Sequence, residues 1–146
     1  MKYNAIDKMI IYYQDDVIRI NHALKVYGFA ESIALSENLS GEKLEILLLA
    51  AILHDIGIKE AEKKYNSSAG NFQEIEGPPI ARNIMEELVV PQNIIERVCF
   101  LVGNHHSYKK IDDIDFQILI EADFFVNAYE NKMERKTIES FCQKYF

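Results

Sequence analysis

The sequence lacks an excess of positive charge. Its 146 residues include 16 lysines and arginines against 23 acids, which gives a formal net charge of −7. A surface of this kind does not favour non-specific binding to a nucleic acid backbone or to anionic lipid. It still permits a small anionic substrate, because a bound metal ion or a few lysines can reverse the field locally. We therefore expect a small-molecule partner, with no non-specific nucleic acid binding and no membrane binding.

Long apolar runs and cysteine-rich motifs are also missing. The longest uninterrupted apolar run, Ile46 to Leu53, is far too short to cross a bilayer. The first residues do not contain a basic segment followed by an apolar core, so they do not resemble a secretory signal. Only Cys99 and Cys142 are present, without CxxC spacing, which predicts two reduced, buried thiols. Together these observations favour a cytoplasmic protein.

What is present predicts one folded helical domain over residues 1–146. Apolar and aromatic residues make up 49% of the chain, enough for a substantial single core. Their period is that of helices, and strict alternation is hard to find, so we expect an all-α bundle of six to eight helices around an apolar central helix at 42–56. Helices are expected at 4–14, 15–36 with a bend or break at Gly28, 42–56, 59–64, 78–89, 91–103, 112–131 and 134–145.

One segment between these helices predicts a long loop. Serine, asparagine and glycine cluster in "YNSSAGNFQEIEG", without an apolar period, and Pro78 and Pro79 then suit the first turn of the next helix. Long loops in compact domains often close over a binding site. We therefore expect the segment Tyr65 to Glu76 to close over a substrate.

Histidines and acids interrupt the apolar helices in an unusual number. His22, the adjacent His54 and Asp55, and Asp123 each lie beside strongly apolar residues. Taken singly, such a histidine is more often a hydrogen-bonded core residue, Asp55 a turn residue, and Asp123 the partner of a lysine. Burying several acids together is costly unless a positive charge lies among them. A divalent metal ion supplies that charge and accepts imidazole and carboxylate ligands.

The order of these residues resembles the HD superfamily of metal-dependent phosphohydrolases. The match comprises His22, then "LLLAAILHDIG" with His54 and Asp55, then "ILIEADFFVNA" with Asp123. The resemblance implies a helical bundle in which these four residues bind one metal ion. It also implies catalytic roles for Asp55 and His54, through a water that attacks phosphorus.

A second metal ion is implied by similarity to two-metal bacterial members, which include dinucleoside polyphosphate hydrolases. Glu76 in "EGPP" stands where such members carry a histidine before Gly-Pro, and His105 in "GNHHS" stands where they carry another. Asp55 would then bridge the two ions. His106 follows directly, but adjacent helical residues point about 100° apart, so we do not expect it to serve the same ion as His105 equally. Carboxylate in place of imidazole favours iron, manganese or magnesium over zinc.

The implied reaction is hydrolysis of a phosphate ester or anhydride in a small phosphorylated substrate, above all a nucleotide. A di-iron oxygenase on the same ligands and a non-catalytic nucleotide sensor remain alternatives, because a fold alone does not decide a function. The sequence leaves the substrate, the metal and a homodimer open. The candidate substrate-binding residues are Lys59, Arg82, His106, Lys109 and Lys110.

Overall fold

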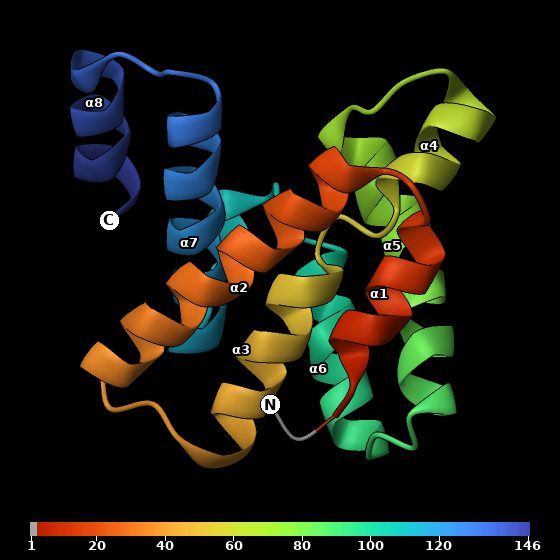
Figure 1. The fold of residues 1–146 in the computed structure, drawn as a ribbon. Coiled ribbons are helices and arrows are strands. Elements are labelled where there is room, and N and C mark those ends of the chain that lie inside the picture. The colour runs from red at the N-terminus through yellow and green to blue at the C-terminus, as the bar shows by residue number, and fades with distance from the viewer. Residues whose placement is uncertain (1–2) are drawn as a thin grey trace.

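The computed structural model describes residues 3–146, and these fold as a helical bundle (Figure 1). Over the described residues there are eight α-helices, one 3-10 turn and no strand, so the predicted all-α class is confirmed. In chain order the elements are α1 (Ala5–Tyr13), α2 (Val17–Ser36), α3 (Gly41–Leu53), α4 (Ile58–Tyr65), α5 (Gly70–Glu87), α6 (Gln92–Val102), η1 (Tyr108–Lys110), α7 (Ile114–Glu130) and α8 (Arg135–Tyr145).

Helix α3 lies at the centre of the bundle, as predicted for the apolar segment (Figure 1). Every residue from Ile46 to Leu53 is buried, which leaves no solvent-facing side on this part of the helix. It packs against α1, α2, α6 and α7. Each large apolar side chain buried here contributes roughly 1.5–3 kcal/mol to folding. The strongest hydrophobic segment therefore becomes the fixed frame on which the polar residues after Leu53 are mounted.

The end of α3 differs from the prediction. The helix stops at Leu53 rather than near residue 56, because the next residues form a tight turn that leads directly into α4. The backbone N–H of Ile58 donates to the carbonyl of Asp55 at 3.0 Å, and the hydroxyl of Tyr13 donates to the same carbonyl at 2.9 Å. His54 and Asp55 consequently sit on a turn that is tied to α1, at the end of a rigid helix.

The prediction of a long loop at residues 65–76 is wrong. Helix α5 begins at Gly70, so only residues 66–69 connect α4 to α5. The apolar period was missing because buried positions of α5 carry polar residues, Gln73 and Glu76. Tertiary contacts order the segment: Tyr65 and Phe72 stack with ring centroids 4.3 Å apart. Residues 65–76 therefore do not form the long loop that was expected to close over a substrate.

The two prolines lie inside α5 rather than in its first turn. Pro78 and Pro79 remove two backbone donors, yet the helix continues to Glu87. Just before them, α5 passes very close to the turn after α3. A Cβ atom added to Gly57 would lie 2.5 Å from the backbone nitrogen of Gly77, which real Cβ atoms do not tolerate. Glycine at position 57 therefore lets α5 approach the turn that carries His54 and Asp55.

The remaining helix boundaries are close to those expected, with two exceptions. Helix α2 continues through Gly28 without the predicted break, and the short turn η1 was not foreseen. Both cysteines are free thiols; Cys99 is buried as expected, whereas Cys142 is partly exposed. None of the helices described here has the length and apolar character needed to span a membrane.

Candidate metal centre

Four elements bring the predicted histidines and aspartates to one place. His22 comes from the second turn of α2, His54 and Asp55 from the turn after α3, Asp123 from α7, and His105 from the turn after α6. The side chains of His54 and His105 are fully buried, and those of His22 and Asp123 are nearly so. The arrangement joins residues that are 101 positions apart in the chain, such as His22 and Asp123.

The first group gathers His22, His54 and Asp123, with ligand atoms within 4.8 Å of one another. Oδ1 of Asp123 lies 3.1 Å from Nε2 of His22 and 3.3 Å from Nε2 of His54. Oδ2 of Asp55 lies 3.3 Å from both of these nitrogens. The four residues that the family resemblance singled out therefore point their ligand atoms at one small volume.

The second group consists of Asp55, His105 and His106, again with ligand atoms within 4.8 Å of one another. Oδ1 of Asp55 lies 3.3 Å from Nε2 of His105. Because Oδ2 of the same carboxylate faces His22 and His54, Asp55 presents one oxygen to each group. This is the placement that a carboxylate shared by two ions would require.

Backbone carbonyls set the orientation of two imidazoles. Nδ1 of His54 lies 2.8 Å from the carbonyl oxygen of Ala51, and Nδ1 of His105 lies 2.8 Å from that of Val102. A carbonyl oxygen can only accept a hydrogen bond, so Nδ1 carries the proton in both rings. In the neutral imidazole Nε2 then keeps its lone pair and faces the carboxylates, as a metal ligand does.

The carboxylate of Glu130 orients the imidazole of His22 in the same way. Its Oε1 lies 2.7 Å from Nδ1 of His22, and its Oε2 accepts a hydrogen bond of 2.7 Å from Lys25. Sequence reasoning missed Glu130. Helical spacing could have indicated it, because Asp123, Asn127 and Glu130 lie on one face of α7. On this face Asn127 donates to Oδ1 of Asp123 at 3.0 Å.

The buried carboxylates of this group favour a bound cation. Burial opposes ionisation of Asp55, but His54 and hydrogen bonds from His105 and His22 hold its pKa well below the ordinary value. Burial likewise opposes charge on His22, but hydrogen bonds to Asp123 and Asp55 raise its pKa to about 10. Without another cation, protons on the imidazoles must therefore balance the carboxylates.

One buried atom supports the metal assignment directly. Among the described residues, Nε2 of His54 is a buried polar side-chain atom with no hydrogen-bond partner. A buried nitrogen without a partner is costly, and native structures leave few of them. A metal ion bound by His22, His54, Asp55 and Asp123 would use this nitrogen as a ligand. The residues present therefore fit a divalent ion.

Glu76 is not brought into either group. It is largely buried on α5, but its Oε1 accepts from Nζ of Lys64 at 2.6 Å and its Oε2 from the hydroxyl of Tyr65 at 3.1 Å. The hydrogen bond from Lys64 lowers the pKa of Glu76, which keeps it ionised in this pair. Its role as a metal ligand thus stays a prediction without geometric support.

Helical geometry does not apply to His106, because this residue does not lie on a helix. Helix α6 ends at Val102, so His105 and His106 belong to the following turn and the 100° rotation per helical residue does not apply. Their ring centroids are 4.0 Å apart. His106 is fixed from the other side by Gln73, whose Oε1 lies 3.0 Å from Nε2, and by Glu74, which accepts its backbone N–H at 3.2 Å.

The basic residues expected to bind the substrate lie in two different settings. Arg82 is committed to a fork of two hydrogen bonds with Glu96, at 2.7 and 3.0 Å, and Nζ of Lys59 lies over the ring of Tyr12 at 5.4 Å. These contacts do not connect Arg82 or Lys59 to the two groups. Lys109, in contrast, lines a hollow together with His106.

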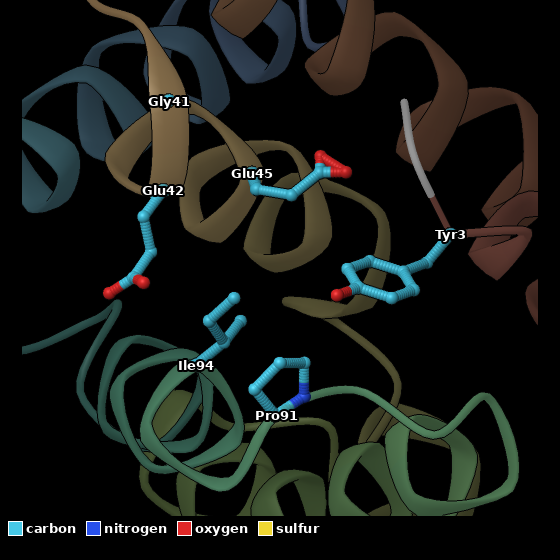
Figure 2. A pocket seen from close by; sticks show the side chains of 6 residues that line it. All are labelled: Tyr3, Gly41, Glu42, Glu45, Pro91 and Ile94. Carbon is cyan, nitrogen blue, oxygen red and sulfur yellow. The ribbon is translucent and has the colours of Figure 1, made fainter.

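A different hollow lies at the other end of α3 (Figure 2). Helix geometry puts the start of α3 about 20 Å from its end, so this hollow is remote from the two groups. Glu42 and Glu45 contribute two carboxylates to it, and no base lies among its lining residues, so it suits a phosphate poorly. Its lining residues are Tyr3, Gly41, Glu42, Glu45, Pro91 and Ile94.

Comparison with known families agrees with this geometry. The HD domain family model matches residues 19–144, which is most of the chain and includes every residue of the two groups. The chain therefore belongs to the HD domain family, whose superfamily consists mostly of metal-dependent phosphohydrolases. No match to the chain was found among curated proteins or among solved structures.

Proposed function

We propose that this protein is a metal-dependent phosphohydrolase that cleaves a phosphate ester or anhydride, with a nucleotide as the substrate class. The observation that carries the proposal is the buried meeting of Asp55 and Asp123 with imidazoles that all turn Nε2 toward them. This arrangement needs a cation, and it leaves Nε2 of His54 close to two carboxylates but without a hydrogen-bond partner.

The two groups define which residues would hold metal. His22, His54, Asp55 and Asp123 would hold one divalent ion, and Asp55, His105 and His106 would hold a second. A divalent ion there supplies a Lewis acid that lowers the pKa of water and offsets charge on phosphoryl oxygens. The expected preference for iron, manganese or magnesium over zinc was based on Glu76 as a ligand, and in the structure this residue is paired with Lys64.

The chain itself positions the reactants. Hydrolysis forms a bond from a water oxygen to phosphorus and breaks the bond from phosphorus to the leaving oxygen; the water protons end on the leaving group and the released phosphate. Asp55 stays ionised because its pKa is lowered, so its carboxylate can accept a hydrogen bond from the attacking water and orient it. Burial of His54 and His105 excludes bulk water from this side of the site.

A panel assay tests the proposal. Protein purified without chelator is analysed for metal content and then incubated with nucleotides and dinucleoside polyphosphates in the presence of manganese or iron. We expect phosphate release that His54→Ala and Asp55→Ala abolish together with most of the metal. Arg135→Ala is the matched control, since Arg135 is exposed on α8 and, within residues 3–146, pairs only with Glu139. Unchanged metal content in the two site variants would refute the assignment.

One observation also favours a second candidate, a di-iron oxygenase. Asp55 presents one oxygen to each group, which suits a pair of iron ions as well as it suits hydrolysis. Turnover that consumes oxygen with iron-loaded protein, and no phosphate release from any substrate of the panel, would favour this candidate. Binding of a nucleotide without either reaction would instead indicate a sensor.

A further inference from the structure

A hollow adjoins the second group and is lined by residues of two separate elements. It is formed by η1, the residues just before it, and the end of α8; we refer to it as the η1–α8 hollow. His106 belongs to both the second group and the hollow, so the two are contiguous. Tyr108 also lies within the field of Asp123: burial raises the pKa of this phenol, and the charge of Asp123 raises it further. The lining residues are His106, Ser107, Tyr108, Lys109, Lys110 and Tyr145.

Positive charge gathers around this hollow although the chain as a whole is acidic. Lys109 has no hydrogen-bond or ion-pair partner anywhere in residues 3–146, and Lys110 donates only to the neutral amide of Asn104, at 3.1 Å. A third ammonium group, that of Lys144, lies 5.2 Å from the ring centroid of Tyr145. None of these three lysines is neutralised by a carboxylate within the described chain.

Glu74 contacts the residues just before η1, and its carboxylate is already engaged. Glu74 accepts hydrogen bonds from the hydroxyl of Ser107, at 3.1 and 3.2 Å, and from the backbone N–H of His106. These bonds hold the residues that precede η1 against α5. The carboxylate therefore fixes the inner wall of the hollow, while Lys109 and Lys110 remain available to an anionic ligand.

Packing also fixes the opposite wall. Helix α8 is held against α7 by a stack of Phe141 on Phe124, with ring centroids 3.9 Å apart and planes inclined by 6°. Tyr108 meets Tyr145 and Phe141 edge-on, at centroid distances of 5.1 and 5.5 Å. Figure 1 shows α8 standing beside α7. The hollow is thus built by two elements whose separation is set by aromatic contacts.

These contacts favour an anion over a flat ring as the ligand. The ammonium group of Lys144 lies over the ring of Tyr145, and Tyr108 meets the rings of Phe141 and Tyr145 at steep angles, so both tyrosines are already engaged by neighbouring groups. Ammonium groups without carboxylate partners bind phosphate oxygens through charge-assisted hydrogen bonds. The tyrosines form the walls, and the lysines supply the binding groups.

We propose that the η1–α8 hollow binds a second phosphate of the substrate, carried by the leaving group, while the phosphoryl group to be cleaved lies at the two metal groups. This inference rests on the proposed function and narrows its substrate class to compounds with at least two phosphates, such as nucleoside diphosphates and triphosphates. Lys109 and Lys110 bind the second phosphate, and His106 lies between the two positions.

Kinetics with matched substrates test this specificity. ADP carries a phosphate on its leaving group, whereas the nitrophenyl leaving group of p-nitrophenyl phosphate carries none. Loss of charge-assisted hydrogen bonds in Lys109→Ala/Lys110→Ala should lower kcat/KM for ADP by about tenfold or more, mainly through KM. The same variant should leave p-nitrophenyl phosphate within about twofold, because that substrate lacks the group in question. Lys136→Ala, which removes an exposed lysine near the start of α8, is the control.

Binding of inorganic diphosphate separates this inference from the hydrolase proposal. Calorimetry on the chelated full chain should show binding that weakens with salt, survives in His54→Ala and is lost in Lys109→Ala/Lys110→Ala. That result supports the hollow even if no substrate is hydrolysed. Binding that survives the lysine substitutions, or no binding at all, overturns the inference, as does an equal loss of kcat/KM for both substrates.

Discussion

Glu130 accepts a hydrogen bond of 2.7 Å from Nδ1 of His22, a residue that precedes it by 108 positions. The contact joins the last residue of α7 to the second turn of α2 and keeps Nε2 of the imidazole directed at Asp123. Lys25, one turn from His22 on α2, binds the other oxygen of Glu130 at 2.7 Å and limits its rotation. The ligand atom of His22 is therefore oriented by residues outside the candidate metal group.

Substitution of Glu130 should weaken metal binding without removing any proposed ligand. Loss of an acceptor that orients a metal-binding histidine reduces metal affinity by about 10–100-fold. We expect Glu130→Ala to fall in this range and Glu130→Gln, which keeps an oxygen at the same position, to have a smaller effect. Competition with a metal-binding dye measures both. Glu134→Ala, at the exposed start of α8, is the control, and equal affinity of the two alanine variants would contradict the orienting role.

Metal removal should destabilise the folded protein. An ion that binds only the folded state adds about 2.7 kcal/mol at a free concentration one hundred times its Kd. Chelation should therefore lower Tm in the natural chain, and the shift should vanish in His54→Ala, which lacks the buried Nε2. Scanning calorimetry with and without chelator gives the comparison. A chelator-dependent shift that persists in His54→Ala would mean that the metal binds elsewhere.

The stability of the metal-free protein and the affinity for metal should change with pH in opposite directions. In the metal-free protein the pKa of His22 is raised from 6.5 to about 10, because hydrogen bonds to Asp123 and Asp55 outweigh burial. Its contribution to stability is complete below pH 6.5 and is lost as the pH rises toward 10. A metal ion must displace that proton, so metal affinity should increase over the same range.

Urea unfolding of chelated protein at several pH values, together with metal titrations, tests these slopes. His22→Gln should flatten part of the decrease in the stability of the metal-free protein, because the titrating imidazole is gone. An increase in that stability between pH 6.5 and 10 would be inconsistent with the raised pKa of His22.

Another buried acid, which belongs to neither candidate metal group, predicts a purely structural effect. Asp115 is 1% exposed and accepts two hydrogen bonds from Arg97, at 2.6 and 2.9 Å. Arg97→Met would leave this carboxylate buried without its cation, which costs about 3–5 kcal/mol. Urea midpoints should show this loss, and the double variant Arg97→Met/Asp115→Leu should recover most of it. Arg135→Ala, which breaks an exposed pair, should change stability by less than about 0.5 kcal/mol.

The sequence predicted the central helix and the main residues of the site because strong local signals mark them. The apolar run at 46–53 can only be buried, and His54 and Asp55 follow it directly. Spacing and order then indicated His22 and Asp123, which the structure brings within hydrogen-bond distance of one another. Such features depend on neighbouring residues and on helical period, and both can be read from a single chain.

The features that could not be predicted depend on contacts between distant segments. The first two turns of α5 looked like a loop because their buried positions carry Gln73 and Glu76, whose polar groups are satisfied by the backbone of Ser68 and by Lys64. Glu130 looked like one acid among many, because its partner lies on another helix. Polar residues that are buried through specific partners do not show a periodic signal.

The stoichiometry of metal binding should distinguish between the two versions of the second site. The family resemblance assigns Glu76 and His105 to it, whereas the structure gathers Asp55, His105 and His106 and pairs Glu76 with Lys64. We expect His105→Ala to reduce the metal content from about two ions to one, because it removes a shared ligand in either version. Glu76→Ala should leave the content unchanged, and His106→Ala should lower it. The reverse pattern, with loss in Glu76→Ala alone, would show that metal draws Glu76 away from Lys64 and that the pair seen here belongs to the metal-free state.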